Sequence, residues 1–481
     1  MENKKTARVI FIGIITYMLL SWIIVAGNFN ESIYTNTGHN QIGLFDLVLA
    51  PINLLNSFIE AKTQNSAGIV SSFSYINTVL AFVAIGVYYA VLNKTGAYQV
   101  LIDKLSNKLN KHKNITLISV GVLFYLISVL TGLNLVLFFT LPFIVTILMK
   151  LKFNKPTIFT ATIGSMLIGR ISCLFDSNVN GLNRMLYQTK IIELVPSRII
   201  FFLLLLIVVI AVLLLTVERE VSKEEEIPLL EESDNKKTNF IPIIIISTII
   251  FIILSVCMYN WYYMFNIKTL SDGYNNIMGA NINKYNYMKN IFGMTEEFGF
   301  WSGFTMSSLL ILGTFVIKFI YNIKFDNYIE GVKTGLSKML PTVALSFLCL
   351  TTVVFSIYYS DSFIYSIINR VMKMFEDNVV IGTFISTFIH SFTVNDYFAT
   401  MTTISPALIS TYGQDNISLI TFISQITYGI TSLISPFSLY LVASLSYLGL
   451  SYTKWLKYIF KALFVVTLLS IVILFITVRF F

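Results

Sequence analysis

Residues 197–217 read SRIIFFLLLLIVVIAVLLLTV, and this stretch decides the class of the protein. From Ile199 to Val217, the only polar side chain is that of Thr216. An α-helix needs about 20 mostly apolar residues to cross the hydrocarbon core of a bilayer. The stretch therefore predicts a membrane-spanning helix.

The composition of the whole chain extends this prediction beyond one helix. Of the 481 residues, 56% are hydrophobic and only 12% are charged. A soluble domain carries about 25% charged residues, so this chain has too little polar surface to cover a globule in water. Because similar apolar stretches recur along the sequence, we expect an all-α polytopic membrane protein that crosses the bilayer about ten or more times.

The cysteines, the net charge and the absence of several motifs argue against other classes of protein. Cys173, Cys257 and Cys349 lie in apolar stretches without the spacing of a disulfide framework or a metal site, which is typical of small buried side chains. The net charge of +8 is explained by lysines in cytoplasmic loops, as in other membrane proteins. We therefore expect no nucleic-acid partner. The sequence has neither the G-x-x-x-x-G-K-S/T loop of ATP-driven pumps nor the H-E-x-x-H and G-x-S-x-G motifs of hydrolases. We therefore expect no enzyme, no bound metal and no organic cofactor.

Basic residues orient the chain in the membrane. Lys4, Lys5 and Arg8 precede the first apolar stretch, and an excess of lysine and arginine marks cytoplasmic segments. Most later lysine clusters are separated by two crossings, which agrees with the same rule. We expect a multi-pass protein of a bacterial cell membrane with its N-terminus in the cytoplasm. A cleaved signal peptide is the alternative for this segment, but its apolar stretch, residues 9–26, is long for one.

A charged stretch divides the chain almost in half. Residues 218–239 contain three consecutive glutamates and a pair of lysines between apolar stretches, which predicts a cytoplasmic linker. Residues 1–217 and 240–481 then form an N-terminal and a C-terminal transmembrane half. A layout of two halves is typical of transporters built from inverted repeats.

Other polar stretches are expected at the membrane surface. Residues 43–60 and 95–112 are too short or too amphipathic to span, which favours helices lying in the interface with the lipids. Residues 264–297 are rich in asparagine, tyrosine and lysine, and we expect an extracytoplasmic connection with interfacial helices.

Several apolar stretches are too short or too polar to cross the bilayer simply. Residues 133–149 follow the preceding stretch after only Thr131 and Gly132, and residues 435–449 are rich in serine. Such segments fit re-entrant hairpins or broken helices, which a bilayer tolerates where protein or a water-filled cavity satisfies the backbone. The expected breaks lie near residues 133–180, 379–397 and 427–438.

Polar side chains gather at these expected breaks in both halves. Interrupted helices expose N–H groups that bind anions, and carbonyl groups that coordinate cations together with side-chain oxygens. Asp176 and Asp396 are ionisable groups within apolar surroundings, where they would take a proton, pair with a cation or hold a substrate ammonium group. The candidate substrate-binding residues are Asp176, Ser177, Asn178, Ser391, Thr393, Asn395, Asp396, Thr431, Ser432 and Ser435.

Each of these residues also has a purely structural interpretation. Serine and threonine in membrane helices often donate to the carbonyl group four residues earlier. Asp176 also fits an external loop near the interface, and Arg170 fits either snorkelling or a structural pair with Asp176. His390 alone makes no metal site, since no second histidine or cysteine accompanies it. The functional interpretation rests on two similar polar breaks in two halves.

Motifs along the chain add a resemblance to a known family. Ile434-Ser435-Pro436 resembles an N-x-I-x-P-T/S element, and residues 448–457 (LGLSYTKWLK) resemble an L-G-V-P-Y-x-K-W-L-K ending. Residues 388–393 align with an I-P-S-G-S hairpin tip, and residues 328–333 with F-I-E-G-A-K. These elements belong to the YfcC/DcuC-like family of the ion-transporter superfamily, which includes basic amino-acid antiporters and C4-dicarboxylate carriers.

The resemblance implies a secondary transporter with two inverted repeats, paired re-entrant hairpins whose tips hold the substrate, and an elevator-type movement. It also implies a homodimer among membrane lipids, with Na⁺ or H⁺ as the coupling ion. The sequence departs from the family at His390 and Phe392, where the hairpin tip has proline and glycine, and at Gly132-Leu133-Asn134, which replace an acidic pair.

From Asp176 and Asp396, we expect an ion-coupled symporter or exchanger for an amino acid such as arginine or ornithine. The alternatives are a carrier of C4-dicarboxylates or other carboxylates, a transport-inactive membrane partner protein and a passive channel.

Overall fold

The structure is a computed structural model of the chain. It describes residues 2–30, 32–60, 67–190, 194–217, 227–230, 239–280, 286–293, 295–358 and 361–480. Most of the predicted linker 218–239 lies outside the described residues, namely 218–226 and 231–238.

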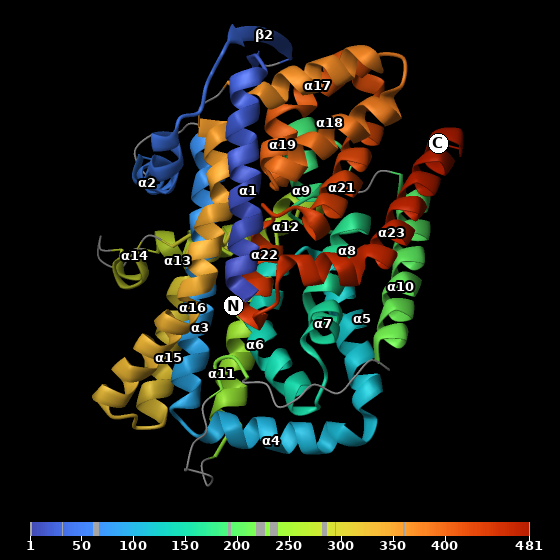
Figure 1. The fold of residues 1–481 in the computed structure, drawn as a ribbon. Helices are drawn as coiled ribbons and strands as arrows, with labels where there is room; N and C mark the ends of the chain where they lie inside the picture. The colour runs from blue at the N-terminus through green and yellow to red at the C-terminus, as the bar shows by residue number, and fades with distance from the viewer. Residues whose placement is uncertain are drawn as a thin grey trace.

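Helices account for nearly all of the described first half (Figure 1). They are α1 (Glu2–Ile23), α2 (Leu44–Glu60), α3 (Ala67–Asn93), α4 (Ala97–Leu109), α5 (Lys113–Thr131), α6 (Asn134–Lys150), α7 (Lys155–Phe159), α8 (Ser165–Ser172), α9 (Asn180–Tyr187) and α10 (Val195–Val217). A π-helical turn, Thr160–Gly164, joins α7 to α8.

The second half is built in the same way. Its helices are α11 (Ile241–Cys257), α12 (Trp261–Phe265), α13 (Thr269–Gly279), α14 (Tyr287–Phe292), α15 (Gly303–Ile320), α16 (Phe325–Val353), α17 (Phe363–Met374), α18 (Val379–Thr393), α19 (Tyr397–Thr403), α20 (Ser405–Tyr412), α21 (Ile417–Ile434), α22 (Leu439–Leu448) and α23 (Tyr452–Phe480). Short turns lie at Asn110–His112, Val354–Tyr358 and Gln414–Asn416.

The predicted all-α polytopic membrane fold is confirmed. Eight helical segments of the described residues are long and apolar enough to cross a membrane, and shorter apolar helices include α6, α11 and α18. Because the shorter apolar helices are not among the eight, the expected number of ten or more crossings stays a prediction. The eight segments are Glu2–Ile23, Tyr75–Asn93, Ala97–Thr131, Val195–Thr216, Gly303–Ile320, Phe325–Ser356, Gln414–Leu448 and Tyr452–Arg479.

One small sheet departs from the helical prediction. Strands β1 (Ala26–Asn30) and β2 (Ile33–Gly38) pair in antiparallel fashion just after α1. The hairpin is fixed to the start of α17, since Gly27 and Ser362 exchange two backbone hydrogen bonds of 3.2 and 3.0 Å. No sequence pattern predicts this hairpin, because its strands are short and polar.

Helices are found where interfacial segments were expected. The structure places α2 over residues 43–60 and α4 over residues 95–112, and α4 lies across one end of the bundle in Figure 1. Three short helices, α12 to α14, occupy the described part of residues 264–297. Their position at a lipid interface stays a prediction.

The two halves meet at the centre of the bundle. Helix α5 packs against α8, helix α18 packs against α21, and α8 packs against α21 across the boundary between the halves. Around this centre, α3 packs against α15 and α16, while α10 and α23 run side by side along one edge (Figure 1).

A glycine permits the close approach of α8 and α21. A Cβ atom on Gly429 of α21 would lie 2.6 Å from Cα and 2.8 Å from the backbone nitrogen of Ile171 in α8. Backbone atoms cannot move aside as the end of a side chain can, so the two halves depend on this glycine for their contact.

We therefore predict that Gly429→Ala destabilises the protein by about 1–3 kcal/mol, since the added methyl group forces α8 and α21 apart. The measurement is the midpoint of thermal unfolding in detergent. Gly273→Ala is the matched control, because nothing lies within 4 Å of a Cβ atom at this helical glycine. An equal midpoint for the two variants would contradict the prediction.

Candidate functional site

Four breaks in the helices lie at the centre of the molecule. In the first half, they are Gly132–Leu133 between α5 and α6, and Cys173–Val179 between α8 and α9. In the second half, they are Val394–Asp396 between α18 and α19, and Ser435–Ser438 between α21 and α22. They fall within the regions where the sequence predicted interrupted helices.

The two breaks of the first half hydrogen-bond to each other. The backbone N–H of Ser177 donates to the carbonyl oxygen of Thr131 at 3.2 Å, and Nδ2 of Asn178 donates to the carbonyl oxygen of Gly132 at 2.7 Å. Leu174 also donates from its backbone N–H to a carbonyl oxygen of α5, at 3.0 Å. Each break therefore satisfies backbone groups that the other leaves open.

The two breaks of the second half are joined through side chains. Ser435 donates from Oγ to the carbonyl oxygen of Phe392 at 2.6 Å. Ser432 donates from Oγ to Oδ1 of Asn395 at 3.2 Å, while Nδ2 of Asn395 donates to the carbonyl oxygen of Ser391 at 2.9 Å. The hydroxyl of Thr431 lies 3.0 Å from that of Ser391. These hydroxyl and amide groups thus connect α18 with α21.

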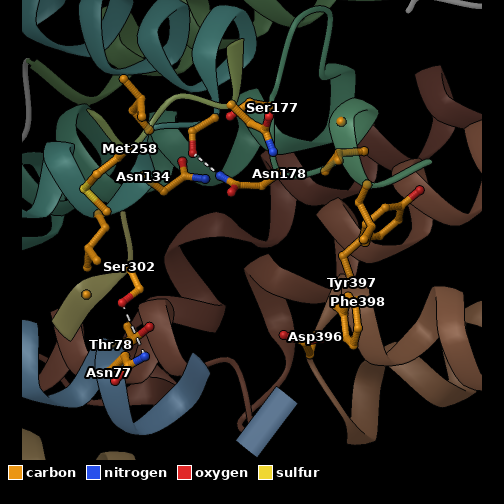
Figure 2. A pocket seen from close by; sticks show the side chains of 18 of the residues that line it. Asn77, Thr78, Asn134, Ser177, Asn178, Met258, Ser302, Asp396, Tyr397 and Phe398 are labelled. Carbon is orange, nitrogen blue, oxygen red and sulfur yellow. Dashed lines mark hydrogen bonds between the residues drawn. The ribbon is translucent and has the colours of Figure 1, made fainter. Parts of the chain in front are cut away.

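A cavity of about 500 Å³ lies between the two sets of breaks. Figure 2 shows Asn134, Ser177 and Asn178 on one side of it, with Asp396 and Tyr397 across from them. Residues of α3 and of the segment before α15 complete the lining, among them Asn77, Thr78 and Ser302.

Arg170 supplies the positive charge of this cavity. Its side chain is only 8% exposed, and Nη2 donates to the hydroxyl of Tyr428 at 2.6 Å. The guanidinium carbon lies 4.9 Å from the ring centroid of Tyr428 and 5.1 Å from that of Tyr440, which are cation–π distances. Its Nε is buried without a hydrogen-bond partner, and Arg170 forms no salt bridge with the described residues.

Asp396 is the acidic residue opposite this cation. Its Oδ1 accepts a hydrogen bond of 2.6 Å from the backbone N–H of Ala399, so it caps the first turn of α19. The hydroxyl of Tyr75 lies beside the same carboxyl group. Asp396 is therefore held by α19 while its carboxyl group borders the cavity.

Asp176 lies behind the cavity and does not line it. It is 1% exposed, and its Oδ1 accepts from the backbone N–H groups of Asn178 at 2.8 Å and Val179 at 3.2 Å. Its carboxyl group fills the space beside Gly132, where a Cβ atom would come within 1.9 Å of Oδ1. Asp176 thus neither lines the cavity nor lies in an exposed loop at the interface, because its carboxyl group is buried and holds the backbone of the break.

The predicted substrate-binding residues fall into two groups, those that line the cavity and those that do not. Ser177, Asn178, Asn395 and Asp396 line the cavity. Six of the predicted residues do not line it, and the hydroxyl groups among them bond within the protein instead: Asp176, Ser391, Thr393, Thr431, Ser432 and Ser435.

Sequence reasoning missed several lining residues. The predicted substrate-binding residues do not include Arg170, although a basic side chain inside an apolar stretch is itself a signal of function. Asn134 directly follows the Gly132 break, and the sequence indicates it only as part of a departure from the family, not as a lining residue. Tyr75, Tyr428 and Tyr440 carry no local signal, because tyrosine is common throughout this chain.

Glu296 lies at the edge of the cavity next to the start of α15. It accepts hydrogen bonds from the backbone N–H of Ser302 at 2.5 Å and from its Oγ at 2.6 Å, and also from the hydroxyl of Thr305. The carboxylate is thus committed to the first turn of α15, where a negative charge is favourable.

Comparison with known families decides the class of this site. Residues 4–479 match the model of the C4-dicarboxylate anaerobic carrier family, DcuC. The chain belongs to this family. The resemblance inferred from the sequence motifs is confirmed, and so is the expectation of a carrier in place of an enzyme.

Two further comparisons say less about the class of this protein. No curated protein matches the chain. Among solved structures, the YdaH transporter of Alcanivorax borkumensis, described as having an unusual topology, matches at 10% identity and a TM-score of 0.37 over 99% of each chain.

Membership of the DcuC family does not support an amino-acid substrate. It favours the carboxylate alternative, and the presence of Arg170 in the cavity agrees with that choice.

The geometry of Asp176 yields a second prediction. Asp176→Ala removes the acceptor of two backbone N–H groups, so we expect the protein to lose about 1–3 kcal/mol of stability. Ser177→Ala, which keeps that acceptor, is the control. The thermal unfolding midpoint in detergent measures both, and an Asp176→Ala variant as stable as wild type would contradict the assignment.

Proposed function

We propose that this protein is a secondary transporter that carries C4-dicarboxylates across the cell membrane. The observation that carries the proposal is the buried Arg170, whose Nε has no hydrogen-bond partner among the described residues while its side chain borders the cavity. A buried cation in a membrane protein is costly, and it marks a substrate or ion pathway by default.

The chemistry of Arg170 suits a carboxylate. A guanidinium group presents donors in a planar fork that matches the two oxygens of a carboxylate. Tyr428 occupies one donor, and the rings of Tyr428 and Tyr440 hold the group in position. The described residues accept no other hydrogen bond from this guanidinium group, so in this proposal its remaining donors bind one carboxylate of the substrate.

The wall that lies across from Asp396 offers partners for a second carboxylate. The first turn of α6, with Leu135 and Val136, borders the cavity, and the N-terminus of a helix carries a partial positive charge. Asn134 and Asn178 bring side-chain amides to the same wall (Figure 2). In this proposal, one carboxylate of a short molecule binds Arg170 and the other binds this wall, while Tyr428 and Tyr440 of the C-terminal half hold Arg170 in position.

The arrangement of breaks supports the rest of the predicted mechanism. Each half contributes two interrupted helices that hydrogen-bond to each other at or beside their breaks, as inverted repeats would. In this proposal, α5–α9 and α18–α22 form the unit that moves, and α3, α15 and α16 form the scaffold. The homodimer and the choice between symport and exchange remain predictions.

We predict that Arg170→Gln weakens succinate binding by about 1.5–3 kcal/mol, or roughly ten- to hundredfold in Kd, because a charge-assisted hydrogen bond is lost. Arg170→Lys should bind at an intermediate level, since lysine cannot form the planar fork. The measurements are the succinate-dependent thermal shift in detergent and the uptake of labelled succinate into proteoliposomes.

Arg370→Gln is the matched control, because Arg370 is exposed on α17 and lies away from the cavity. It should bind and transport succinate as wild type does. Stabilisation of the wild type by arginine or ornithine and not by succinate would overturn the proposal in favour of an amino-acid carrier.

A further inference from the structure

The charges that line the cavity do not balance those of a C4-dicarboxylate. The ionisable carboxyl groups and cations of the lining are Asp396, Glu296 and Arg170, so acidic groups outnumber the cation before any substrate enters. A dicarboxylate adds two negative charges. Bringing them beside an ionised Asp396 within a membrane protein is costly unless a positive charge arrives with them.

The surroundings of Asp396 make it the group that can accept this charge. Glu296 accepts three hydrogen bonds at the start of α15, whereas Oδ1 of Asp396 accepts one from the backbone N–H of Ala399 and the carboxyl group borders the cavity. The groups that face Asp396 are Arg170 of α8, Tyr75 of α3, Tyr428 of α21 and Tyr440 of α22. None of these is a second carboxylate that would compete for a proton.

We propose that Asp396 takes up one proton from solution when a C4-dicarboxylate binds, and that this proton crosses the membrane with the substrate. The inference rests on the proposed function. A protonated Asp396 has an O–H group that donates to a substrate carboxylate, whereas the ionised form repels it. The proton leaves Asp396 when the substrate is released on the other side.

His390 is the neighbouring titratable side chain, and its geometry argues against this role. The ring is fully buried and does not line the cavity. Nδ1 lies 3.0 Å from the hydroxyl of Thr400, and Nε2 lies 3.1 Å from that of Thr403. The ring also stacks on Tyr365 of α17, so no ring nitrogen is directed to the substrate.

Proton uptake is measured directly by isothermal titration calorimetry of succinate, in buffers of different ionisation enthalpy at one pH. Wild type should take up about one proton per succinate, and Asp396→Asn should bind succinate without proton uptake. Between about pH 7 and pH 9, where succinate is fully ionised, Kd of the wild type should rise by up to about tenfold per pH unit. Kd of Asp396→Asn should stay flat.

His390→Asn is the matched control and should keep the proton uptake of wild type. If Asp396→Asn does not bind succinate, Tyr75→Phe takes its place, because loss of the hydroxyl beside Asp396 should shift the midpoint of the pH profile.

Succinate binding by wild type without proton uptake, or with uptake abolished only in His390→Asn, overturns the inference but not the proposed function. Binding that requires Na⁺ without proton uptake also overturns it. Failure of wild type to bind succinate at any pH contradicts the proposed function itself.

Discussion

The mutual hydrogen bonding of interrupted helices is the constraint on which the rest of this structure depends. A break in a helix leaves backbone groups open, and a bilayer offers no water to satisfy them. Here the break at Cys173–Val179 donates to carbonyl groups of α5 through Ser177 and Asn178. In the second half, Ser435 joins its break to that of α18. Because the breaks must meet in pairs, polar groups of both halves come together at one place.

The cavity between the breaks is lined by many polar side chains, of which only a few are charged. Most hydroxyl and amide groups of the predicted site are occupied with holding the breaks together, as Ser432 and Asn395 are. The groups left over for a ligand are few, and Arg170 is the cation among them. This division explains how one set of polar residues stabilises an interrupted membrane fold while a smaller set supports recognition of a carboxylate.

The sequence predicted the helical class, the places where helices break and part of the site. Apolar length and the Gly132 and Pro436 signals act over a few neighbouring residues, so they are readable without a fold. The direction in which a side chain points cannot be read from neighbouring residues in this way. Asp176 and Asp396 are both acidic residues at breaks, but Asp176 turns back onto two backbone N–H groups and Asp396 borders the cavity.

By itself, the sequence determined that this protein is a polytopic membrane protein of interrupted helices, because burial in lipid requires long apolar stretches and penalises every polar exception. Only the tertiary structure decided which exceptions face a ligand. Arg170 gains its place from the contact of α8 with α21, more than 250 residues apart in sequence, and from the rings of Tyr428 and Tyr440. Long-range packing sets that geometry, and no local pattern encodes it.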